Sequence, residues 1–240
     1  MQREFDKLFV PSIFPKALGE PVNLLLDGTF FSRADGVLVF RANSKNLYWR
    51  FVQSETLKEI TSGLDELEKA NYRFKSVTLD GRKGVIMLFK ARYSHMPIQM
   101  CQFHQAQIIR RYTTNKPQTL CGLALKSIMS CLTQVTQEVF ESLVETWHEQ
   151  YADFLKERNE NVQFKHRKLR SAFRSLKTNM PYLFAYKNFP ELNIPNTTNS
   201  CDGSFAHWKQ KLKIHRGLRK HRRDKMINFL LSQQQNSITF

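Results

Sequence analysis

The sequence predicts an α/β fold in which helices flank a mixed five-stranded sheet and an all-α insertion precedes the last part of the fold. Up to residue 112, apolar runs of strand length alternate with helical repeats in the order βββαβαβα. Beyond it, over residues 116–187, the periodicity is helical. With 240 residues, 41% of them hydrophobic, the chain can form a sizeable core.

The strands come first, after an irregular lead-in over residues 1–20. Short polar turns separate the first three runs, which is typical of an antiparallel meander. A helix at 56–71 follows, for which Ser54 is a candidate cap. We then expect strands at 75–80 and 97–104, each followed by a helix, at 84–91 and 105–112. The three opening strands are expected at 22–31, 36–42 and 46–52.

These elements suggest three consecutive parts. The first part of the core covers 21–112 and the helical insertion covers 113–192. The last part, 193–235, holds a helix that opens near Asn199, a run of basic residues and a short helix that ends near Leu231.

The net charge of +16, from 37 basic and 21 acidic residues, favours a polyanionic partner. Nucleic acid is favoured over two alternatives, an anionic membrane surface and a basic protein that only needs solubility. Neither a membrane-spanning apolar run nor a signal-peptide core is present in the sequence. Four scattered cysteines fit a reducing cytosol.

Two aspartates lie in predicted strands, at positions where a carboxylate could have a chemical role. Asp27 interrupts the apolar run VNLLLDGTFF, and a carboxylate inside a buried strand is unfavourable unless it is paired or binds a cation. Asp80 ends another strand and precedes Gly81, although Asp-Gly is also a common turn dipeptide. Two such carboxylates could hold Mg²⁺, which prefers oxygen ligands.

In this order, the segments LLLDGTFF, VTLDGRKGV, CQFHQAQ and NTTNSCDGSFAHWKQKLKIHRGL resemble the Mutator-type transposases of bacterial insertion sequences. The resemblance runs from about Asn23 to Leu231 and weakens in the helical insertion. It implies an RNase H-like fold and a DDE/DDD site made of Asp27, Asp80 and Asp202. At the third position the commonest residue in that family is Glu, so this chain is a DDD variant. The implied cofactor is Mg²⁺ at a two-metal site, with Mn²⁺ as a substitute.

Other residues near these acids have alternative interpretations. Cys101 and His104 form a C-x-x-H pair that resembles one near the active centre of these transposases, where it could position the acids through hydrogen bonds. A buried Cys with a satisfied His fits equally well, and no second pair completes a zinc site. Asn199 could cap the last long helix and so present Asp202 in its first turn.

Basic residues near the C-terminus predict contacts with DNA phosphates. Lys209 lies two helical turns after Asp202, on the same face, and a solvated surface lysine is the alternative. Trp208 could stack on an unpaired base, although such a tryptophan more often belongs to the core. The segment from Lys165 to Lys177 could form a second surface for the backbone. The predicted DNA-binding residues are Trp208, Lys209, Lys211, Lys213, Arg216, Arg219 and Arg222.

The resemblance implies metal-dependent cleavage at transposon ends and strand transfer into target DNA. It also implies a homodimer or higher oligomer on DNA, in the bacterial cytoplasm with the nucleoid and without a membrane. Only 26 residues precede Asp27, too few for a three-helix DNA reader, so we expect a truncated product or a reader on another subunit. The alternatives are another RNase H-like nuclease and a truncated or domesticated, non-catalytic DNA-binding remnant.

Overall fold

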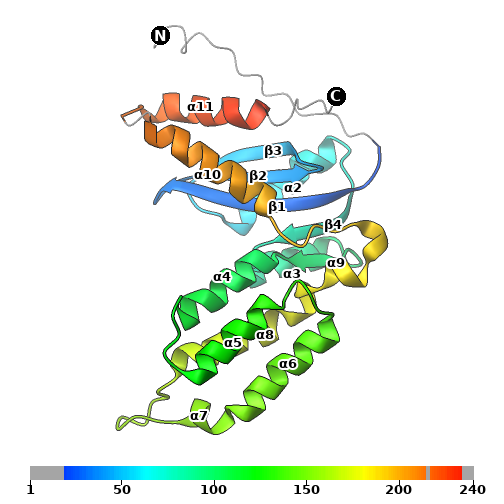
Figure 1. Ribbon diagram of the computed structural model, residues 1–240. Coiled ribbons are helices and arrows are strands. Elements are labelled where there is room, and N and C mark those ends of the chain that lie inside the picture. The colour runs from blue at the N-terminus through cyan, green and yellow to red at the C-terminus, as the bar shows by residue number, and fades with distance from the viewer. Residues whose placement is uncertain (1–18, 215–216, 234–240) are drawn as a thin grey trace.

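The computed structural model describes residues 19–214 and 217–233, so nearly all of the predicted lead-in lies outside the described residues. As predicted, the fold is a mixed five-stranded sheet flanked by helices (Figure 1). The strand order β3-β2-β1-β4-β5 is compatible with an RNase H-like α/β fold. The strands are β1 (Val22–Ser32), β2 (Asp35–Ala42), β3 (Lys45–Val52), β4 (Phe74–Leu79) and β5 (Ile98–Met100).

The first three strands form the predicted antiparallel meander. On the other side of β1, β4 pairs with β1 in parallel, and β5 pairs with β4 in parallel. The last strand differs from its prediction. It covers three residues, and α4 (Gln102–Thr113) begins at once with Cys101 in the N-cap position. The last three residues of the segment 97–104, which we expected to be a strand, are therefore helical, and His104 lies in the first turn of α4.

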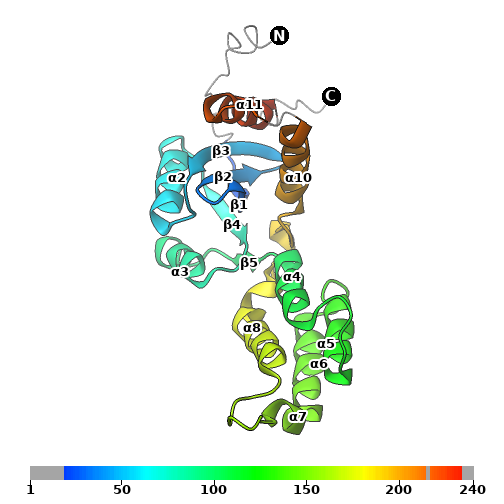
Figure 2. The ribbon, with the colours of Figure 1, turned by 90° about the vertical axis from the view of Figure 1, so that its left-hand side faces the viewer.

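The two faces of the sheet carry different helices because side chains alternate along each strand. Leu24 and Leu26 pack in one core with α2 (Leu57–Lys69) and α3 (Lys83–Arg92). Leu25 packs in a second core with α10 (Asn199–Ile214) and α11 (Lys220–Gln233). Figure 2 shows α2 and α3 on one side of the strands and α10 on the other.

Two further contacts define the ends of these elements. Thr56, not the predicted Ser54, caps α2, since its hydroxyl accepts the Glu59 N–H at 3.2 Å. At the edge of the sheet, β3 is held by α11, whose Leu231 carbonyl accepts from the Asn46 amide at 3.0 Å. A covered edge strand is protected from pairing with other chains.

The segment between α4 and α10 is helical and extends away from the sheet beyond β5 (Figure 1). It has its own apolar core, to which Ile109 of α4 and Trp147 contribute. No described helix is both long enough and apolar enough to cross a membrane. The helices of this segment are α5 (Leu120–Ser130), α6 (Gln137–Gln150), α7 (Ala152–Lys156), α8 (Arg167–Leu183), α9 (Ala185–Asn188) and the 3-10 turn η1 (Pro190–Leu192).

Candidate metal centre

Asp27 lies in the middle of β1 and is only 8% exposed. Strand alternation places it on the same face as Leu25, which packs against α10. Its Oδ1 accepts the Gly28 N–H at 2.8 Å, whereas Oδ2 is buried with no hydrogen-bond partner among the described residues. A buried carboxylate oxygen without a donor is unfavourable and is satisfied when a cation binds it.

Asp202 lies in the first turn of α10, and a buried arginine fixes that turn. The Arg41 guanidinium donates to the Ser200 carbonyl at 2.5 Å and to the Ser204 hydroxyl at 3.0 Å. The capping position differs from the prediction. The Thr198 carbonyl accepts the N–H of Asp202 at 3.1 Å, whereas Asn199 is an exposed residue inside the helix. Thr198 therefore precedes the helix as its cap.

The segment that leads into α10 is fixed by buried polar side chains of the sheet. The Asn23 amide donates to the carbonyls of Leu192 and Asn193, both at 2.9 Å. The Thr78 hydroxyl donates to the Pro195 carbonyl at 2.6 Å. These bonds position the start of α10, and with it Asp202, above β1.

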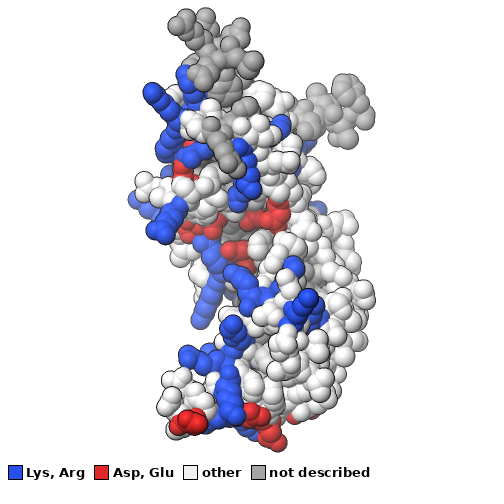
Figure 3. Space-filling model, turned by 60° about the vertical axis from the view of Figure 1, so that its left-hand side comes forward, with Lys and Arg blue, Asp and Glu red and all other residues white. Residues whose placement is uncertain are grey.

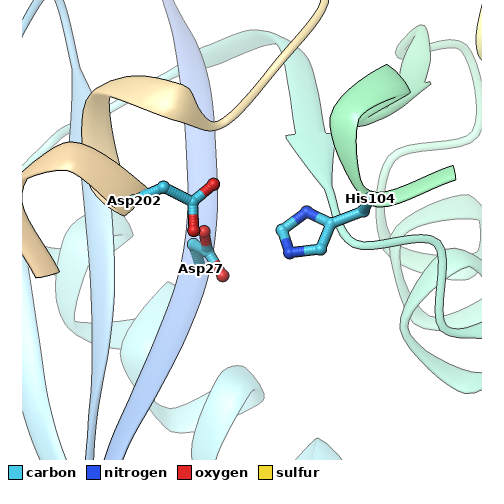
Figure 4. Close-up of side chains that lie close together, drawn as sticks. All are labelled: Asp27, His104 and Asp202. Carbon is cyan, nitrogen blue, oxygen red and sulfur yellow. The ribbon is translucent and has the colours of Figure 1, made fainter. Parts of the chain in front are cut away.

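His104 completes a group of three potential ligands. One ligand atom each from Asp27, His104 and Asp202 lies within 4.8 Å of the other two. Figure 4 shows the two carboxylates side by side and the imidazole facing them from α4. The predicted acids Asp27 and Asp202 therefore do meet, with a histidine as the third member.

Thr198 links this group to Cys101. Its hydroxyl lies 3.5 Å from His104 Nδ1, from Asp202 Oδ2 and from Cys101 Sγ, and its N–H donates to Cys101 Sγ at 3.3 Å. Cys101 is fully buried behind the three ligands. This arrangement supports the positioning role considered for the C-x-x-H pair, because both residues share hydrogen bonds with the loop that presents Asp202.

Burial, nearby charges and hydrogen bonds shift the pKa values of this group. Burial and then the nearby charge of Asp202 raise the pKa of Asp27 from 3.8 to about 7. The hydrogen bond with Cys101 is the main cause that raises the pKa of His104 from 6.5 to about 9. Burial raises the pKa of Cys101, but hydrogen bonds with His104 and Thr198 leave it below its usual value. Without a metal, the imidazole of His104 is therefore protonated at neutral pH and faces the carboxylate of Asp27 with a positive charge.

Asp80 does not belong to this group. It follows β4, two positions after Thr78, which pairs with Leu25, so continuing this parallel register just past the end of β4 brings Asp80 level with Asp27. Its carboxylate instead pairs with the Arg82 guanidinium at 3.2 Å and accepts the Arg82 N–H at 3.1 Å. The prediction of one site with three acids thus holds for two carboxylates, while the third is held by an arginine.

Glu55 is an acid that the sequence analysis missed. It pairs with Arg82 at 2.9 Å, and its carboxylate lies over Gly28, where an added Cβ would come within 1.6 Å of Oε1. Burial raises the pKa of Glu55 above its ordinary value. Its segment, QSET, carries no motif, so only the tertiary structure shows that Glu55 and Arg82 border the centre on the side of Asp80.

The basic C-terminal segment is only partly exposed. Lys209, Lys213 and Arg219 are exposed, and Arg216 lies outside the described residues. Lys220 and Arg223 both pair with Asp35, which fixes α11 to the sheet. In the view of Figure 3, basic side chains lie above and below a band of acidic side chains at the waist of the molecule.

Trp208 does not have the stacking role considered for it. It is 1% exposed and packs with Leu25, Val37 and Phe205 beneath α10. A ring in this position cannot reach a base without unfolding α10 from the sheet. The interpretation as a core residue is therefore correct, and Trp208 drops out of the predicted DNA-binding set.

We expect Trp208→Ala to lower the free energy of unfolding by about 3–5 kcal/mol, the usual effect of removing a buried tryptophan. Its neighbour Lys209 is exposed, so Lys209→Ala should change stability by less than about 0.5 kcal/mol. Urea unfolding of both variants, followed by circular dichroism, measures the difference. Unchanged stability of Trp208→Ala together with weaker binding of single-stranded DNA would restore the stacking role.

The donor set fits a divalent cation. The two carboxylates supply hard oxygen ligands that suit Mg²⁺ or Mn²⁺, and the imidazole nitrogen suits a transition metal. The partnerless Oδ2 of Asp27 is the observation that favours a cation over a purely structural cluster. We therefore expect this group to bind Mn²⁺ more tightly than Mg²⁺.

A scan against protein-family models finds no match for this chain, and a search of the curated proteins finds none either.

Proposed function

We propose that this chain is the catalytic domain of a DDE/DDD-type DNA transposase, similar to the Mutator-type enzymes, which cuts transposon ends and joins them to target DNA. The observation that supports it best is the meeting of Asp27 and Asp202 on a chain of net charge +16. Paired carboxylates beside basic surfaces suit metal-assisted chemistry on a phosphodiester.

Each residue then has a task in the reaction. Asp27 and Asp202 would hold the cation, and Thr198 orients Asp202 and His104 through its hydroxyl. Held by these residues, a divalent cation would supply activation of the attacking oxygen and stabilisation of the leaving oxygen in an in-line phosphoryl transfer. Exposed lysines such as Lys209 and Lys213 would hold the backbone of the DNA as it crosses the centre.

In this proposal Asp80 is the third acid, and it acts after release from Arg82. Its position beside Asp27 on a parallel strand makes it available to the same phosphate. Pairing two transposon ends calls for a homodimer or a higher oligomer on the DNA. The reaction would take place in the bacterial cytoplasm, with the DNA of the nucleoid.

The test is metal-dependent nicking of supercoiled plasmid, with Mg²⁺, Mn²⁺ or EDTA. We expect the wild-type protein to nick in either metal, and Asp202→Ala to lose nicking while it still binds DNA. Asp153→Ala is the matched control, because Asp153 on α7 is fully exposed and far from the centre. A second arm supplies an oligonucleotide with a free 3′-hydroxyl and measures its joining to plasmid.

The outcomes separate the three candidate functions. Nicking with joining supports the transposase, whereas nicking without joining supports another RNase H-like nuclease. If wild-type protein and Asp202→Ala bind DNA equally well and neither nicks, the chain is a DNA-binding remnant. Equal nicking by the two proteins would remove Asp202 from the site.

A further inference from the structure

A polar pocket lies between the start of α3 and one face of α8. The cavity volume of this pocket is about 320 Å³. Six of its lining side chains can bind an anion. Two are cations, Lys83 of α3 and Arg174 of α8, and four are hydroxyls, Tyr112, Ser171, Ser175 and Thr178.

The cations of this pocket are not used elsewhere. Neither Lys83 nor Arg174 forms an ion pair with a described residue, and both are exposed. Arg82, Arg92, Lys220 and other cations of the described chain do have carboxylate partners. No Asp or Glu lines the pocket. Its charge is therefore available to a ligand and is not neutralised by the protein.

The hydroxyls form a stripe on α8. Ser171, Ser175 and Thr178 are spaced by four and three residues, so they share one face of the helix. Leu169, Ala172 and Leu176, on the other face, are buried in the helical core. Hydroxyl groups between two cations are typical ligands of phosphate oxygens.

The pocket begins next to Asp80. Gly81 lines it and directly follows Asp80, and Lys83 is the first residue of α3. A positive φ of 85° at Gly81 makes the turn that separates the two sites. The N-terminal end of α3 adds a partial positive charge on the same side.

We propose that this pocket binds a phosphate of the DNA backbone, next to the phosphate that reacts at the metal centre. The inference rests on the proposed function. A free phosphate offers the same chemistry, so the experiment below must separate the two sources of phosphate. DNA is favoured because the pocket begins next to Asp80 and the chain has a net charge of +16.

The test compares two double variants in EDTA, where no cleavage occurs. Lys83→Gln/Arg174→Gln removes the cations of the pocket. Lys69→Gln/Lys156→Gln removes the same charge from two exposed lysines at the ends of α2 and α7. Fluorescence anisotropy of a labelled duplex gives the affinity at several salt concentrations. Losing one phosphate contact should make the negative slope of log K against log salt shallower by about 0.9 in Lys83→Gln/Arg174→Gln and leave it unchanged in the control.

Acetylation of Lys83, followed by mass spectrometry, locates the ligand and separates the two sources of phosphate. Duplex DNA should protect Lys83 severalfold and leave Lys69 reactive. Protection by millimolar inorganic phosphate but not by DNA would overturn the proposal, as would equal salt slopes for the two double variants. Failure of the proposed function is a different result: the protein shows no metal-dependent nicking, although DNA still protects Lys83.

Discussion

Asp27→Asn is expected to abolish metal-dependent nicking and, at the same time, to stabilise the metal-free protein at pH 8. The two effects have one cause, because the carboxylate is buried beside Asp202 and its Oδ2 has no hydrogen-bond partner in the described chain. Asparagine keeps the shape and removes the charge. Its oxygen can accept the Gly28 N–H, and its amide can donate toward Asp202.

The sign follows from the raised pKa. Since the pKa of Asp27 rises from 3.8 to about 7 on folding, the protonated form stabilises the fold below pH 3.8. That contribution is lost as the pH rises to 7. At pH 8 the ionised group costs roughly 4 kcal/mol, at about 1.4 kcal/mol for each of about three pKa units. Urea unfolding in EDTA at pH 5 and pH 8 measures it.

The control is the exposed Asp153→Asn, which should change neither activity nor the pH dependence of stability. If Asp27→Asn is less stable than the wild-type protein at pH 8, the carboxylate contributes to the fold through contacts that outweigh its burial. Retained nicking in Asp27→Asn would remove Asp27 from the metal site.

The second large effect concerns the pH dependence of Mn²⁺ binding. A cation ligated by Asp27 and His104 must displace the proton from each, and their pKa values are about 7 and about 9. The affinity should therefore rise about 100-fold per pH unit below pH 7 and about tenfold per unit between pH 7 and 9. Above pH 9 it should level off.

Isothermal titration calorimetry between pH 6 and 9 tests whether His104 is a ligand or a neighbouring donor. In His104→Gln, metal binding should release one proton fewer. The affinity for Mn²⁺ should then rise about tenfold per pH unit below pH 7 and be level above pH 7. If the wild-type protein already behaves in this way, the imidazole keeps its proton and only orients the carboxylates. No pH dependence below pH 7 would exclude Asp27 as a ligand.

The sheet could be predicted because its information is local. Alternating apolar residues along β1 and β2 determine which side chains face each layer, and Asp27 stands out against them. The three residues of β5 could not be predicted in this way. A run of apolar and polar residues from 97 to 104 does not show where a strand ends and a helix starts.

The site was only partly predictable, because its remaining members depend on contacts between distant segments. Asp202 came from a family resemblance, and nothing local shows that Thr198 would link it to His104. Glu55 and Arg82 meet only when the start of α2 lies against the turn after β4. For Asp80, the strand position was right, but its ion pair with Arg82 follows from the tertiary structure.

The bonds from Asn23 to Leu192 and Asn193 join positions about 170 residues apart, across the whole helical segment. Contacts of such large sequence separation close late, since a long loop must be ordered before they form. A chain whose last segment has not yet docked therefore holds Asp27 without Asp202. Metal affinity would then report completion of folding, and under the proposed function a partly folded chain would not yet cut DNA.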